Sequence, residues 1–96
     1  MPTMNASVAT TDPGRLINRL CKHFGHKVDA RWDETAGQVH FAIGECHLTA
    51  ADGALLLACD APDEDKLAQV GDVVSSHLVR FASGEVASVQ WQPSAA

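Results

Sequence analysis

The sequence has no apolar run of about 20 residues, which is the length that a membrane-spanning helix requires. The segment Met1 to Thr11 has no basic cluster and no continuous apolar stretch, so a secretory signal is not expected. Cysteines are few and odd in number, and Cys21, Cys46 and Cys59 each fall on an apolar face of the predicted elements. Such thiols are typical of a reducing compartment and not of a disulfide framework. We therefore expect a cytoplasmic protein with no membrane partner.

Basic residues are scarce as well. Seven Lys and Arg against twelve Asp and Glu give a formal net charge of −5 and a pI near 5.3, which argues against nucleic-acid binding by the whole surface. The chain also lacks a glycine-rich phosphate loop, a nucleophile elbow and a His-Glu-x-x-His sequence. A binding protein is therefore favoured over an enzyme.

Two helices are predicted in a single domain of residues 1–96, with an ordered core of about 5–92. Asp12 and Pro13 supply an N-cap and a first helical residue, and Gly25 supplies a stop. The second helix begins within Asp60 to Asp65 and ends at Gly84. The apolar stripes at helical spacing are Leu16, Ile17, Leu20, Cys21 and Phe24 in the first helix, and Leu67, Val70, Val74, His77, Leu78 and Phe81 in the second.

Alternating apolar and polar residues predict strands around these helices. The first strand covers Asn5 to Thr10 and the last covers Glu85 to Gln92. Four strands are expected between the helices, and they are centred on Val28–Trp32, Val39–Ile43, Cys46–Ala50 and Ala54–Cys59. The order β-α-β-β-β-β-α-β predicts an α+β two-layer sandwich, with two helices on one face of a mostly antiparallel sheet of five to six strands.

A turn at Ile43-Gly44 would set the register of the second hairpin. It brings four apolar residues to the buried face as the pairs Phe41 with Cys46 and Val39 with Leu48. It also sets His40 opposite His47 on the open face, beside Glu45. Two imidazoles and a carboxylate can hold zinc or nickel, although such pairs on exposed strands usually bind nothing. If the open face is a dimer surface, these residues would be contacts.

The densest group of metal-ligating residue types lies where the first helix ends, at Cys21, His23 and His26. Zinc, iron and copper prefer imidazole and thiolate ligands. His77 is predicted to point at the sheet and to meet His23 or Cys21 across the groove between the helices. The predicted metal ligands are therefore His23, His26, His77 and Cys21, although their spacing is not that of a zinc finger. In the alternative interpretation Cys21 is core, His23 flanks the core stripe, His26 caps carbonyls, and His77 bonds a backbone carbonyl or a hydroxyl of Ser75 or Ser76.

Five of the seven basic residues lie between Arg15 and Arg31, where Asp29 is the only acid. The residues predicted to bind an anion or a partner are Arg15, Arg19, Lys22 and Lys27. Like charges at i, i+4 on a helix repel, so this basic strip would gain from an anionic neighbour. That neighbour could be a phosphate, a carboxylate-bearing ligand, a partner protein, or an acid of the following hairpin. A solvated face with no ligand is the alternative.

Four sequence segments together resemble a known family: Leu20 to Lys27, Asp33-Glu34-Thr35-x-Gly37, Gly44-x-Cys46, and His77 to Phe81. From about Ser7 to Trp91 the chain is similar to domain-of-unknown-function family 2218, a group of small bacterial proteins. The resemblance implies a stand-alone bacterial protein and a connection with siderophores and iron uptake, but no activity. The set of Cys21, His23, His26 and His77 matches the family pattern, whereas His40 and His47 do not.

These observations favour a protein that binds a transition metal, zinc or iron, or an anionic metal chelate near the end of the first helix. The second hypothesis is an interaction module or homodimer that uses the basic strip and the open face of the sheet. An enzyme in which His23 activates a Cys21 thiolate is the third, and it would need an exposed thiol.

Overall fold

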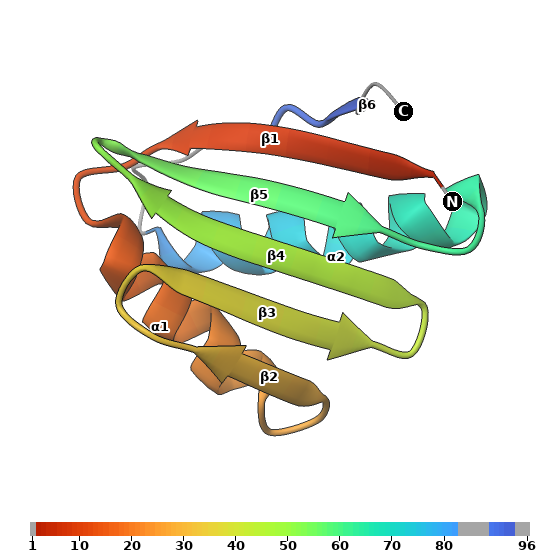
Figure 1. Ribbon diagram of the computed structural model, residues 1–96, viewed down its shortest axis with the longest axis horizontal. Coiled ribbons are helices and arrows are strands. Elements are labelled where there is room, and N and C mark those ends of the chain that lie inside the picture. Colours follow the sequence, from red (N-terminus) through yellow and green to blue (C-terminus); the bar gives the residue numbers. More distant parts are fainter. Residues whose placement is uncertain (1, 83–88, 94–96) are drawn as a thin grey trace.

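The residues that the structure describes form a six-stranded antiparallel sheet with both helices on one face (Figure 1). The computed structural model describes residues 2–82 and 89–93. In chain order the elements are β1 Thr3–Ala9, α1 Pro13–Phe24, β2 Asp29–Trp32, β3 Ala36–Phe41, β4 Gly44–Ala51, β5 Ala54–Asp60, α2 Glu64–Phe81 and β6 Gln92–Pro93. The predicted α+β two-layer sandwich and its order of elements are confirmed.

The strands lie in the order β2-β3-β4-β5-β1-β6, and each neighbouring pair is antiparallel. β5, the most apolar strand, lies between β4 and β1. β6 pairs with Met4 and Asn5 of β1. Half of the last predicted strand, residues 85–88, lies outside the described residues, as does the predicted helix stop at Gly84. Of its other half, residues 89–91 are not in a strand and Gln92 begins β6.

Both helices begin after an aspartate N-cap, as predicted for the first helix, and the second begins within the predicted segment Asp60 to Asp65. The side chain of Asp12 accepts a hydrogen bond from the backbone N–H of Arg15 at 3.1 Å, and Pro13 is the first residue of α1. Asp63 does the same for Lys66 at 2.8 Å at the start of α2. These bonds satisfy N–H groups that have no partner within the helix.

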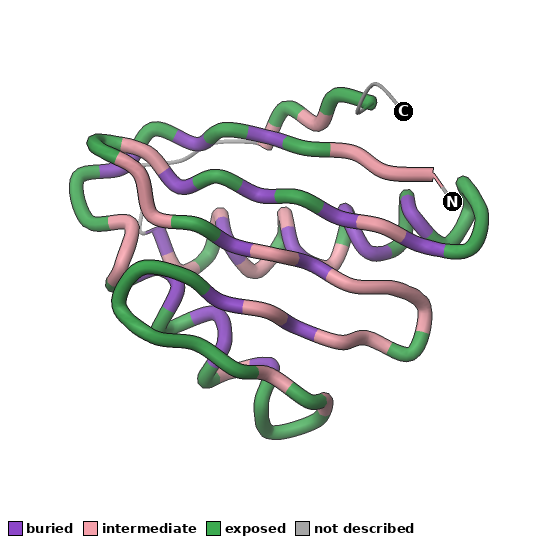
Figure 2. Tube along the Cα trace, viewed as in Figure 1, coloured by how far each residue is buried: buried purple, intermediate pink, exposed green. Residues whose placement is uncertain are grey.

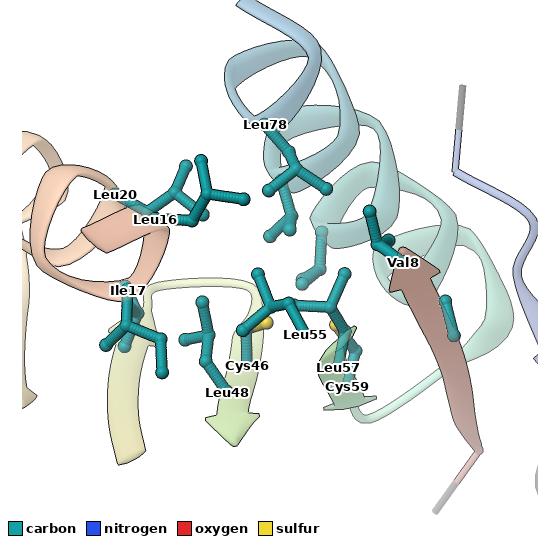
Figure 3. Close-up of a cluster of buried hydrophobic side chains, with 14 of the residues drawn as sticks. Val8, Leu16, Ile17, Leu20, Cys46, Leu48, Leu55, Leu57, Cys59 and Leu78 are labelled. Atoms are coloured by element: carbon teal, nitrogen blue, oxygen red, sulfur yellow. The ribbon is translucent and has the colours of Figure 1, made fainter. Parts of the chain in front are cut away.

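The core lies between the helices and the inner face of the sheet (Figure 3). Figure 2 shows buried and exposed residues alternating along the central strands, which matches the predicted period of two. The three cysteines are free and buried, as expected for reduced thiols, and Cys46 lies directly opposite Cys59. A hydrogen bond with Cys59, together with burial, raises the pKa of the Cys46 thiol well above its ordinary value.

The predicted register of the β3–β4 hairpin is wrong by two residues. Val39 pairs with Cys46, and His40 pairs with Glu45 and not with His47. The strands close at the pair of Phe41 and Gly44, so the turn is Ala42-Ile43. Alternation cannot separate registers that differ by two, because both bury the same face of each strand. In the observed register Gly44 lies close to β5, where a Cβ would collide with the backbone carbonyl of Asp60.

Candidate functional site

The imidazoles of His23 on α1 and His77 on α2 lie side by side, with ring centroids 4.8 Å apart. Each ring also contacts Phe24 and Phe81, at centroid distances between 5.0 and 6.4 Å. The meeting of His77 with His23 that the sequence predicted is therefore present. The His77 ring is half-buried in this aromatic cluster of the two helices, since its neighbours are rings of α1 and α2.

His77 also makes the backbone hydrogen bond that the alternative interpretation expected. Its Nδ1 lies 2.7 Å from the carbonyl oxygen of Val73, one turn earlier in α2. A carbonyl oxygen can only accept, so Nδ1 carries the proton and the Nε2 lone pair of the neutral ring stays available. This is the arrangement in which a second contact fixes the tautomer of a ligating imidazole.

The pKa of His23 is lowered below its ordinary value. Desolvation by burial is the largest cause, followed by the neighbouring His77 and by the positive charges of Lys27, His26 and Arg80. Burial and the neighbouring positive charges therefore both favour the uncharged form of the His23 ring. A neutral imidazole can accept a hydrogen bond or ligate a metal.

Cys21 is separated from this group. Its side chain is fully buried at 0% exposure, and its Sγ lies only 2.8 Å from where a Cβ of Gly37 on β3 would stand. Burial raises the pKa of the Cys21 thiol to about 11, which disfavours the thiolate that metal binding or nucleophilic attack requires. Cys21 therefore serves as a core residue in the geometry observed.

The four predicted metal ligands are not gathered at one point. Cys21 lies beneath the sheet, His23 and His77 form a pair between the helices, and His26 is exposed. Within residues 2–82 and 89–93, three donor atoms lie within 4.8 Å of one another at Glu45, His47 and Asp60, and at no other group. Of the four predicted ligands, the imidazoles of His23 and His77 are close enough to contact one ligand together.

A pocket of about 300 Å³ opens on the surface beside this histidine pair. Its lining, which we call the cationic pocket, is Arg19, Lys22, His23, His26 and Phe81. A second hollow of about 210 Å³ continues along α1, and it shares Arg19 and Phe81 and adds Arg15. The structure thus joins predicted anion-binding residues and predicted metal ligands in one surface feature. Lys27 lies outside both linings, although its charge acts on His23.

The cations of this surface have no acidic partner in the part of the chain that the structure describes. No carboxylate lies within 4.0 Å of Arg15, Arg19 or Lys22 among those residues. Asp33, one of the acids that the sequence offered as a neighbour, instead accepts hydrogen bonds from Thr35 and Ala36 in its own turn. These bonds lower the pKa of Asp33, and they hold its carboxylate within that turn.

A second cluster of ionisable groups lies on the open face of the sheet. Glu45 contacts His40 at 2.7 Å and His47 at 3.4 Å, and Asp60 lies within reach of Glu45 and His47. The sequence analysis found the first three residues but assigned Asp60 to the start of the second helix, which is wrong because Asp60 ends β5. The missed signal was the alternation of β5, which continues one residue past Cys59.

The fold and the pocket define a small α+β protein with a cationic pocket at the contact of its two helices. The chain belongs to the family described as uncharacterized protein conserved in bacteria (DUF2218), which matches residues 5–92, so the predicted membership is confirmed. It is similar to PA4090 from Pseudomonas aeruginosa, whose structure was solved by NMR, with 35% identity, a TM-score of 0.82 and 100% of both chains covered. No curated protein matches the chain. Neither helix of the described chain is long and apolar enough to cross a membrane.

Proposed function

We propose that this protein binds a small anionic ligand, of the class of anionic metal chelates, in the cationic pocket. The observation that carries the proposal is the lining itself: Arg19, Lys22 and two imidazoles surround one aromatic ring, and the two fixed cations have no carboxylate partner among the described residues. The chain as a whole is acidic, with a net charge of −5. A local group of unpaired cations on such a chain favours an anion at that place.

The residue types of the pocket suit a carboxylate-rich or catecholate-type ligand. The guanidinium of Arg19 can hold a carboxylate through two parallel hydrogen bonds, and Lys22 adds a point charge. The rings of Phe81 and His23 lie 5.4 Å apart and offer an apolar surface for a flat part of the ligand. A pocket of about 300 Å³ is at the small end of ligand sites, so a compact chelate fits best.

A chelate accords with this geometry better than a bare ion does. A bare zinc or iron ion requires three or four protein donors, but His23 and His77 supply two. A chelated metal brings its own donors and leaves one or two positions, which an imidazole nitrogen can fill. Ferric chelates are the members of this class that siderophore and iron handling involve, and we extend the proposal to them. The three free cysteines support a bacterial cytoplasmic location.

Calorimetric titration with ferric citrate, citrate alone and zinc chloride tests the proposal. The double variant Arg19→Ala/Lys22→Ala should bind ferric citrate at least about 10-fold more weakly, because each lost charge-assisted hydrogen bond is worth about 1.5–3 kcal/mol. The matched control is Lys66→Ala, an exposed cation at the start of α2, whereas Phe81 of the pocket is the last residue of that helix. Equal affinity in the double variant, or tighter binding of bare zinc than of the chelate at this pocket, contradicts the proposal.

The second proposal is an interaction module or homodimer that uses the open face and the basic strip. It is favoured by Leu56, which is 41% exposed and lines a hollow of about 530 Å³ on that face. Sedimentation velocity should then show dimers that form with rising concentration and disappear in Leu56→Glu. If the protein is a monomer at every concentration, the homodimer proposal is contradicted.

A further inference from the structure

A row of ionisable side chains crosses three neighbouring strands on the face of the sheet opposite the helices. His40 on β3 pairs with Glu45 on β4, and Glu45 pairs with Asp60 on β5, so the three residues stand side by side (Figure 1 shows the strands). His47 is two residues after Glu45 and projects from the same face. We call His40, Glu45, His47 and Asp60 the open-face cluster. Residues in register on paired strands are held with little freedom, which is the condition for a preformed binding site.

From this geometry we infer that Glu45, His47 and Asp60 form a binding site for a divalent transition-metal ion of the zinc type. The ligand atoms of the three side chains all lie within 4.8 Å of one another. Nε2 of His47 and Oε2 of Glu45 are 3.4 Å apart. Two ligands about 2.0–2.2 Å from a tetrahedral zinc ion are separated by about 3.4 Å, so this pair already has the spacing of zinc ligands. A side-chain rotation of Asp60 completes the set.

The role of His40 is to position the Glu45 carboxylate. Its Nδ1 is 2.7 Å from Oε1 of Glu45, which is the oxygen that does not face His47. This hydrogen bond fixes the plane of the carboxylate and directs Oε2 toward His47. Ligating carboxylates are commonly held by such outer contacts, and their loss weakens metal affinity about 10- to 100-fold.

The charges of the surroundings favour a cation. The carboxylates of Glu45 and Asp60 together carry two negative charges, and these balance the charge of a divalent ion. The third ligand is an imidazole, which adds no negative charge. Asp29 on β2 stands opposite His40 and adds a third acid to the row. The imidazole ligand selects zinc-type ions over calcium and magnesium, which prefer sites built of oxygen atoms alone.

This site is separate from the cationic pocket. The open-face cluster lies on the outer face of the sheet, whereas His23, Arg19 and Lys22 belong to the helix on the other face. His47 also lines the hollow of about 530 Å³ beside Leu56, so the site is open to solvent on that side. Three protein ligands and an open position are the arrangement in which zinc binds water or a further ligand.

Calorimetric titration with zinc chloride tests the inference on the full chain. His47→Gln and Asp60→Asn should each weaken zinc binding at least about 30-fold, while His40→Gln should weaken it about 10- to 100-fold without abolishing it. The matched control Asp65→Asn changes the same residue type as Asp60→Asn at an exposed position elsewhere, and it should bind zinc like the parent chain. Calcium and magnesium should bind at least about 100-fold more weakly than zinc.

Circular dichroism of each variant establishes that it is folded, and NMR of the parent chain gives a second measurement that needs no variant. Zinc should shift the ring signals of His47 and leave those of His23 and His77 unchanged. Zinc binding that survives in both His47→Gln and Asp60→Asn, or that is lost in His23→Gln/His77→Gln, overturns the inference. The ferric citrate titration of Arg19→Ala/Lys22→Ala is independent of these results, so the proposal for either site can be refuted without the other.

Discussion

Replacement of Gly37 by alanine tests the placement of Cys21 beneath the sheet. A Cβ at this position would lie 2.8 Å from Sγ of Cys21, 3.0 Å from Cγ2 of Ile17 and 3.3 Å from Cβ of Trp32. Overpacking of a core costs about 1–3 kcal/mol, and the loss of backbone freedom in the unfolded alanine chain offsets about 0.4–1 kcal/mol of this. We expect the free energy of unfolding to fall by about 1–2 kcal/mol. Urea unfolding followed by circular dichroism measures it, and the melting temperature should drop by about 5–15 °C.

The double variant Gly37→Ala/Cys21→Ala provides the control. Removal of Sγ makes room for the new methyl group, so the two changes should cost less together than the sum of their separate costs, by about 1 kcal/mol. Additive costs would mean that the two side chains are not in contact. Cys21 would then be free to join His23 at the end of the helix, and the argument that assigns Cys21 to the core would be refuted.

The remaining predictions concern ionisable groups and helix caps. The pKa of Cys21 rises from 9.0 to about 11 on folding, so the unfolded chain loses this proton first. The free energy of unfolding should therefore fall as the pH rises above 9. Urea melts at pH 8 and pH 10 measure this fall, and Cys21→Ala should make it smaller. The pKa of His23 is lowered, so the unfolded chain takes up this proton first and stability should fall as the pH drops below 6.5. An NMR titration should also show a higher His23 pKa in His77→Gln; an unchanged pKa would argue that the two rings are not neighbours. Asp12→Ala and Asp63→Ala should each lower the free energy of unfolding by about 1 kcal/mol through loss of an N-cap, and thermal unfolding that is unaffected would contradict the caps.

The candidate site was only partly predictable from the sequence. The helical phase of His77 was sufficient to predict its meeting with His23, because both helices had to cover one face of the sheet. Cys21 was also predicted as a residue that His77 could meet, yet its thiol lies under Gly37. Because Gly37 has no side chain, α1 can approach β3 closely there. Alternation could extend β5 to Asp60, but Asp60 joins Glu45 through the pairing of β4 with β5, which links residues 15 positions apart in the chain.

The sequence by itself determined the elements of this protein: capping residues, helical stripes and alternating strands specify their type and order, since these depend on neighbours within a few residues. The tertiary structure decided the register of the β3–β4 hairpin, the burial of Cys21, and the two clusters of charged and ligating groups on opposite faces of the sheet. These features depend on which strands pair and how closely the layers approach. Such contacts join residues far apart in sequence, and alternative registers that bury the same faces differ only in the side chains that they bring together.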